Sequence, residues 1–118
     1  MIKAAVIVLA DTETHGDLGR VVNAMMTAKE LIEAGDDVEL LFDGAGTQWP
    51  GILADPDHKS HRLFAQVREV ISGACAHCSR AFEAEEGVRR AELPFLEEYK
   101  GHPSIRRLLQ EGRQVLTF

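Results

Sequence analysis

Residues 3–10 read Lys-Ala-Ala-Val-Ile-Val-Leu-Ala, and after the lysine the run is apolar without alternation. A strand that is buried on both faces, as in a parallel sheet, has this pattern. Across residues 18–32 apolar side chains recur every three or four positions, which predicts a helix capped by Asp17 and ended by Gly35. The apolar run 38–42 predicts a second strand. Strand, helix and strand in this order form a βαβ unit and predict a parallel sheet with a right-handed crossover.

The rest of the chain continues to alternate between strands and helices. After a loop rich in glycine and proline at 43–51, we expect helices from Pro56, over 79–86, over 87–92 and from Pro103, and strands at 71–75, 93–96 and 114–118. Pro94 confines its strand to a strand start or a sheet edge, because proline has no N–H to donate. The predicted fold class is α/β, a single three-layer α/β/α domain over residues 1–118 with a mainly parallel sheet of about five strands.

The composition is that of an ordinary globular domain, with 45% hydrophobic and 27% charged residues among 118. A chain of this length buries roughly two-thirds of its unfolded surface, so it needs no disulfides to fold. The net charge of −6 argues against a nucleic-acid partner, because phosphate contacts need a basic face. No apolar run approaches the roughly 20 residues that span a bilayer, so we expect no membrane partner.

The first apolar run looks like the start of a signal peptide. However, Asp11, Glu13 and Asp17 follow it closely, and no small-residue cleavage site closes it. We therefore expect a cytoplasmic protein. In that compartment, a pair of cysteines is more often reactive or metal-binding than joined in a structural disulfide.

Both cysteines of the chain lie in the segment Gly73-Ala-Cys-Ala-His-Cys-Ser79, at the end of an expected strand. Sites in parallel sheets form beyond the C-terminal ends of strands, which is where this segment is expected. The N–H groups and dipole of a helix start favour a thiolate at Cys75, and a protonated His77 would add positive charge. The spacing to Cys78 also permits a disulfide. The plainer alternative is that both cysteines are small apolar residues packed at a strand–helix junction.

Other polar and aromatic side chains are expected in the loops around this edge. Asp11 and Asp43 each close a strand there, where a carboxylate can position substrate or cap a turn. His15 can act as a general acid or base, or simply bond a loop carbonyl. Trp49 is expected in an exposed loop, as a lid over the site, an oligomer contact or loop packing. His102 is interpreted as a cap of the last helix.

The sequence favours neither a zinc site nor a nucleotide site. His58 and His61, with Cys75 and Cys78, have pairwise spacings that suit tetrahedral zinc. A normal crossover would place the start of the histidine-bearing helix far from the cysteines, so we expect no metal site. The loop sequence Gly44-Ala-Gly lacks the lysine of a phosphate-binding loop and follows the second strand instead of the first, so no nucleotide cofactor is expected.

The chain resembles the DsrE/DsrF-like family, which includes the sulfur-relay proteins, in its element order, its length and the motif Gly73-Ala-Cys-Ala-His-Cys-Ser-Arg-Ala-Phe82. The stretch that begins Leu93-Pro-Phe-Leu-Glu-Glu-Tyr-Lys-Gly-His-Pro, and the closing Gln-Val-Leu-Thr-Phe118, resemble a subgroup of small, mostly uncharacterised members. The resemblance implies that Cys75 accepts sulfane sulfur as a persulfide and passes it to a partner's cysteine. It also implies homo-oligomers, trimers or hexamers, with sulfur donor and acceptor proteins as partners. The sequence departs from the relay pattern in its second cysteine, Cys78, which can resolve a persulfide on Cys75 into a disulfide and would thereby undermine a storage or carrier role.

These observations lead to a main hypothesis and two alternatives. The main hypothesis is a cytoplasmic, sulfurtransferase-like sulfur carrier in which Cys75 holds the persulfide and Cys78 modulates or releases it. The first alternative is a non-catalytic oligomeric scaffold or small-ligand-binding protein with packed cysteines. The second is a thiol–disulfide redox protein that uses the two cysteines as a couple.

Overall fold

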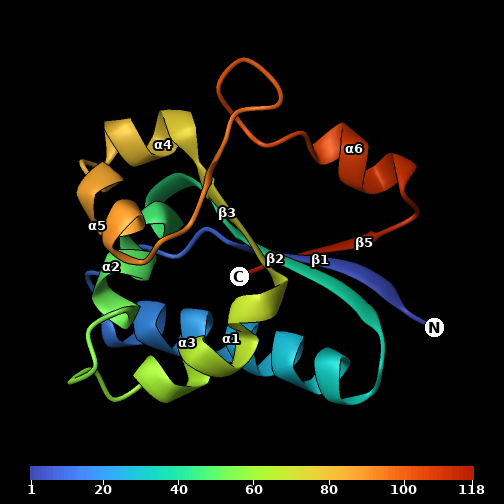
Figure 1. The fold of residues 1–118 in the computed structure, drawn as a ribbon, viewed down its shortest axis with the longest axis horizontal. Helices are drawn as coiled ribbons and strands as arrows, with labels where there is room; N and C mark the ends of the chain where they lie inside the picture. Colours follow the sequence, from blue (N-terminus) through green and yellow to red (C-terminus); the bar gives the residue numbers. More distant parts are fainter.

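The computed structural model describes residues 1–118 and contains one five-stranded sheet in the order β4-β3-β2-β1-β5 (Figure 1). The strands are β1 (Lys3–Val8), β2 (Asp37–Phe42), β3 (Ile71–Cys75), β4 (Phe95–Leu96) and β5 (Gln114–Thr117). The helices are α1 (His15–Glu33), α2 (Trp49–Leu53), α3 (His61–Val67), α4 (Ala76–Ala81), α5 (Glu85–Arg90) and α6 (Ile105–Gln110), with 3₁₀ turns η1 (Gly44–Gln48) and η2 (Arg68–Val70). None of the helices is long and apolar enough to cross a membrane.

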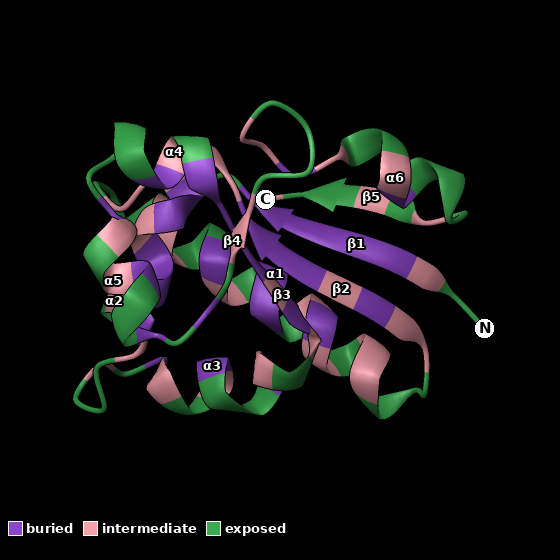
Figure 2. Cartoon of the chain, turned by 45° about the horizontal axis from the view of Figure 1, so that its top comes forward, coloured by how far each residue is buried: buried purple, intermediate pink, exposed green.

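The predicted α/β fold is confirmed, because every strand pairing is parallel and helices lie on both faces of the sheet. On one face, Val6 and Val8 of β1 pair with Leu40 and Phe42 of β2, and α1 and α3 cover them in a cluster of 19 buried residues. On the other face, the intervening strand residues meet Leu108 of α6 in a cluster of only four. Figure 2 shows β1 and β2 buried along most of their length and the edge strand β5 largely exposed. The core is therefore deep on one side of the sheet and thin on the other.

Two helices begin at residues other than those predicted, because hydroxyl side chains cap them. The Thr14 hydroxyl accepts a hydrogen bond from the Asp17 N–H at 3.1 Å, and the Asp17 carboxylate accepts one from the Thr14 N–H at 3.1 Å. Asp17 thus completes a capping box from inside α1 and is not the cap itself. In α6 the cap is Ser104, whose hydroxyl accepts from the Arg107 N–H at 3.0 Å. The preceding proline and His102 lie outside that helix, so the interpretation of His102 as its cap is wrong.

The expected loop at 43–51 is helical instead. Asp43 caps η1, and α2 follows directly with Pro50 in its first turn. Trp49 is buried, and its indole N–H donates to the Ala10 carbonyl at 3.0 Å. Burial of the large ring and a partner for its N–H outweigh the poor helix propensity of the glycines nearby. The expected exposure of Trp49 is therefore wrong, and loop packing is its role.

Around the cysteines, the strand predicted at 71–75 is confirmed and β4 is an edge strand, as Pro94 indicated. α4 starts directly after Cys75, earlier than predicted, and α3 starts later, at His61. The ladder between β2 and β3 skips Ser72, so β3 carries a local bulge near its start.

Gly73 lies where β3 and β4 approach each other closely. Its φ of 148° is in the region that favours glycine, and a Cβ added there would lie 2.4 Å from the Pro94 carbonyl oxygen. The absence of a side chain at Gly73 therefore allows β4 to pair beside Cys75, the last residue of β3. A larger residue would have to push the two strands apart.

Replacing Gly73 with alanine should therefore destabilise the fold by at least about 2 kcal/mol, from backbone strain and from the clash with Pro94. A matched control is Gly19→Ala in α1, because a Cβ at Gly19 meets nothing within 4 Å. The control should leave stability unchanged or raise it by up to about 1 kcal/mol. Urea unfolding of both variants measures the difference, and equal midpoints would contradict the close approach of β3 and β4.

Candidate functional site

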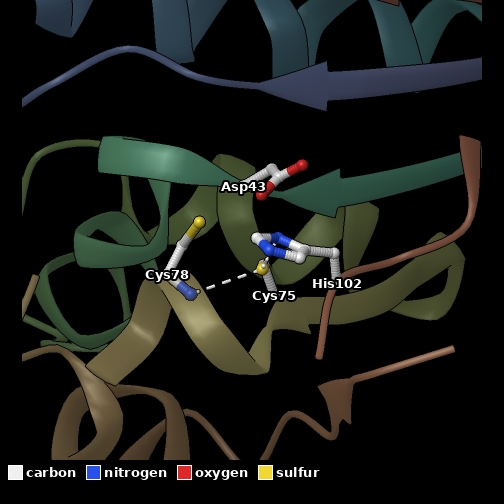
Figure 3. Close-up of side chains that lie close together, drawn as sticks. All are labelled: Asp43, Cys75, Cys78 and His102. Atoms are coloured by element: carbon white, nitrogen blue, oxygen red, sulfur yellow. Dashed lines mark hydrogen bonds between the residues drawn. The ribbon is translucent and has the colours of Figure 1, made fainter. Parts of the chain in front are cut away.

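Four side chains with metal-ligating or nucleophilic chemistry meet at the C-terminal edge of the sheet (Figure 3). They are Asp43 after β2, Cys75 at the end of β3, Cys78 in α4 and His102 in the loop between β4 and α6. One ligand atom from each lies within 4.8 Å of those from the others. Since these residues come from three separate segments, with both cysteines in the segment 75–78, the parallel topology brings them together.

Cys75 is the centre of the cluster. Its side chain is fully buried, and its sulfur lies 3.3 Å from Nδ1 of His102. The backbone N–H of Cys78 donates to the same sulfur at 3.3 Å, because Cys75 occupies the N-cap position of α4. Figure 3 shows this bond, with the His102 ring beside the Cys75 sulfur and the Cys78 side chain pointing up from α4. The Cys78 side chain is half-buried and is the more accessible of the two thiols.

A tight turn positions His102. Tyr99 and His102 exchange two backbone hydrogen bonds of 2.8 Å, and Lys100 and Gly101 between them both have positive φ, 49° and 85°. Positive φ at both central residues is typical of a type I′ turn. The Gly101 carbonyl accepts a hydrogen bond from the His77 N–H at 2.9 Å, and the rings of His77 and His102 pack with centroids 4.7 Å apart. The start of α4 therefore fixes the turn, and the turn presents His102 to Cys75.

Burial decides the protonation of the Cys75 thiol. It is the largest of the effects that together raise the pKa of Cys75 to about 12, and the Cys78 side chain and the Asp43 carboxylate act in the same direction. The Cys78 backbone N–H acts in the opposite direction but is outweighed. The expectation that a helix start makes Cys75 a resting thiolate is therefore wrong, because desolvation is the larger effect. A nucleophilic Cys75 needs a base to take its proton.

A cavity of about 580 Å³ opens beside the cluster. Asp43, His102 and Arg106 lie on its wall, and Cys75 does not. A small molecule in this cavity would meet the imidazole and the carboxylate first, with the Cys75 sulfur behind His102. A larger cavity of about 890 Å³, lined by residues such as Asp55 and His58, contains neither cysteine.

Some residues predicted for the site lie elsewhere. His15 is exposed at the start of α1 and is not part of the cluster. Asp11 accepts hydrogen bonds from the Thr12 N–H at 2.7 Å and the Gln48 amide at 3.0 Å. These bonds lower the pKa of its carboxyl group, the one from Thr12 most, and Asp11 thereby fixes the loop after β1.

The histidines of the rejected zinc set also have other partners. Nδ1 of His58 accepts from the Ser60 N–H at 3.0 Å, and Nδ1 of His61 lies 2.8 Å from the Leu53 carbonyl oxygen. Neither belongs to the four-residue cluster. His77 is exposed and supplies no ligand atom to the cluster, but its N–H bonds the Gly101 carbonyl and its ring packs on His102.

Of the predicted residues, Asp43, Cys75 and Cys78 thus meet, and His102 is the one that sequence reasoning missed. Two features of the sequence are consistent with its position at the site. The pair Lys100-Gly101 suits a turn, and the loop that carries His102 follows a strand of the same parallel sheet.

Comparison with known proteins supports the fold and assigns no activity. No protein-family model matches the chain. An uncharacterised protein of Methanocaldococcus jannaschii is 24% identical over 95 residues, which cover 80% of this chain and 77% of that protein. A conserved protein of unknown function from Bacteroides thetaiotaomicron has a solved structure similar to this chain, with a TM-score of 0.61 at 17% identity, over 97% of this chain and 94% of that one. At such identity the structural likeness shows the fold alone.

The raised pKa of Cys75 predicts its rate of alkylation. In the metal-free, reduced Cys78→Ser variant, iodoacetamide should modify Cys75 at pH 7 at least about 100-fold more slowly than the same cysteine in an unfolded peptide. Because the pKa is raised, the rate should keep climbing with pH beyond the ordinary cysteine value of 9.0. Mass spectrometry across a pH series measures it. A plateau below pH 8 would contradict the protonated, buried thiol.

Proposed function

We propose that this protein is a cytoplasmic sulfur carrier in which Cys75 accepts sulfane sulfur as a persulfide and passes it to a partner thiol. The observation that carries the proposal is the 3.3 Å approach of His102 Nδ1 to the Cys75 sulfur. A thiol with a raised pKa becomes a nucleophile when an adjacent base takes its proton, and imidazole is the side chain suited to that task near pH 7. The DsrE/DsrF-like sequence pattern around Cys75 supports the same chemistry.

The transfer step balances without an external oxidant. His102 takes the Cys75 proton, and the resulting thiolate attacks the outer sulfur of a donor persulfide, R–S–S–H. A new S–S bond forms at Cys75 while the S–S bond of the donor breaks. The donor leaves as a thiolate and takes the proton from His102, which yields Cys75–S–S–H and R–S–H. The Cys78 N–H, already bonded to the Cys75 sulfur, stabilises the negative charge during the step.

Cys78 determines how long the persulfide lasts. Its thiol can attack the inner sulfur of the Cys75 persulfide, which forms a Cys75–Cys78 disulfide and releases hydrogen sulfide. An acceptor protein that offers its own thiol to the outer sulfur instead receives the sulfur and regenerates the Cys75 thiol. The half-buried Cys78 therefore competes with the acceptor thiol for the Cys75 persulfide. If the acceptor reacts faster, the protein is a sulfur carrier; if Cys78 reacts faster, it releases hydrogen sulfide.

The cavity beside His102 gives small donors a place to bind. Arg106 supplies a positive charge on its wall, which suits an anionic sulfur donor, while Asp43 lies nearer the thiols. Protein donors, acceptors and a trimeric or hexameric assembly belong to the same proposal. Exposed apolar side chains on the thin face and the edge strand, such as Leu109 and Leu116, support self-association. Sedimentation as a 13.0 kDa monomer would remove the oligomer from the proposal.

A thiol–disulfide redox protein is the second candidate. The Cys75 and Cys78 sulfurs lie within 4.8 Å of each other, so a disulfide needs only a small movement. This candidate predicts a two-electron couple in glutathione redox buffers in the absence of any sulfane donor. The first candidate does not require such a couple.

Persulfide loading tests the proposal. Wild-type protein incubated anaerobically with glutathione persulfide should gain one sulfur atom, about 32 Da, on Cys75, and Cys75→Ser should gain none. Cys78→Ser should hold the adduct longer, because the internal resolving thiol is gone. His102→Ala should load at least about tenfold more slowly, because the base is removed. Intact-mass measurements against time give these rates.

The matched control is His15→Ala, since His15 is exposed and outside the cluster. It should load at the wild-type rate. Unfolding curves confirm that the buried Cys75→Ser variant is folded before its adduct is scored. An adduct that persists in Cys75→Ser, or a folded Cys78→Ser variant that gains no sulfur, would refute Cys75 as the acceptor.

A further inference from the structure

The same four side chains offer a second chemistry that does not depend on persulfide transfer. Asp43, Cys75, Cys78 and His102 supply one carboxylate oxygen, two sulfurs and one imidazole nitrogen. These are the donor types that Zn²⁺ takes in proteins, and four of them complete a tetrahedron. The two cysteines are close in sequence, but Asp43 and His102 are distant from them, so no local spacing motif reveals the whole set.

The distances are close to those of a coordination sphere. With zinc–sulfur and zinc–nitrogen bonds of about 2.3 and 2.0 Å, a tetrahedron places sulfur and nitrogen about 3.5 Å apart. The Cys75 sulfur and His102 Nδ1 are 3.3 Å apart. All the ligand atoms lie within 4.8 Å of one another, so an inward shift of about 1 Å would complete the geometry.

The surroundings hold these ligands in place. The turn at 99–102 fixes the His102 ring with Nδ1 toward the Cys75 sulfur, and the His77 ring packs against it. The Cys78 N–H bonds the Cys75 sulfur, and the Gly44 N–H bonds the Asp43 carboxylate at 2.8 Å. Such outer contacts orient ligands before the metal arrives.

We propose that Asp43, Cys75, Cys78 and His102 bind one zinc-class divalent cation. Binding releases the two thiol protons to solvent and leaves two thiolates, one carboxylate and a neutral imidazole around the ion. The pair of thiolates disfavours Mg²⁺ and Ca²⁺, which prefer oxygen ligands, and the mixed set suits Zn²⁺. In the bound state the cation balances the negative charges of the two thiolates and the carboxylate.

This site has a consequence for the thiols. A cation on the Cys75 and Cys78 sulfurs occupies the electron pairs that attack a sulfur donor or an alkylating agent. Bound zinc and a Cys75 persulfide therefore exclude each other. Zinc should protect both cysteines from iodoacetamide, whether or not the protein carries sulfur in solution.

Cobalt is the probe for this site, because tetrahedral Co²⁺ with thiolate ligands absorbs in the near ultraviolet and the visible. Metal-free, reduced wild-type protein titrated anaerobically with Co²⁺ should develop thiolate-to-metal absorption that saturates at one ion per chain. Added Zn²⁺ should abolish it. Cys78→Ser should weaken Co²⁺ binding at least about 100-fold, and the isosteric Asp43→Asn at least about tenfold.

Both substitutions are at half-buried positions, and unfolding curves show whether the variants fold as wild type does. The matched control is the double variant His58→Ala/His61→Ala, which removes the alternative histidine pair and should bind as wild type. Absence of the thiolate-to-metal band in wild type, wild-type affinity in folded Cys78→Ser, or loss of binding in the histidine control would each overturn the proposal. The readout is a spectrum of bound metal, so it is independent of whether Cys75 accepts sulfur.

Discussion

The packing of the segment after α5 onto the end of β3 is the constraint on which the site depends. Gly73 has no side chain, so the Pro94 carbonyl can approach β3 and β4 can pair beside Cys75. The turn at 99–102 then closes over the start of α4. This arrangement covers the Cys75 sulfur and also brings His102 to it. The same packing therefore buries the thiol and places the imidazole beside it.

The burial of the Cys75 thiol determines its protonation state. A negative charge on Cys75 is opposed by desolvation and by the Asp43 carboxylate, which together keep the pKa of the thiol high. Near pH 7 the sulfur needs His102 to accept its proton, or a cation in the cluster to replace it. The proposed persulfide transfer would use the first route and the proposed metal binding the second. Because both need the same sulfur, the two states would exclude each other, and a change in available zinc would change the fraction of protein able to accept sulfur.

Elements whose position follows from the pattern of neighbouring residues could be predicted from the sequence. The strand at 3–10 was predicted because burial on both faces removes alternation. The strand at 71–75 was placed where the preceding helical pattern ends, and Cys75 followed as the residue at its end. His102 was not found, because its position depends on β4 lying next to β3, a pairing between distant segments. The exposure of Trp49 was predicted wrongly for a related reason. The glycines around it suggested a loop, but contacts with distant core residues fold this segment into η1 and α2.

Both proposed chemistries depend on Cys75 and His102 forming a pair in the resting protein. Nuclear Overhauser spectra of the metal-free, reduced wild type test this pairing most directly. We expect cross-peaks from the His102 ring protons to the Cys75 β protons and to the His77 ring. A His102 ring without these cross-peaks, with the chemical shifts of a freely solvated histidine, would contradict it.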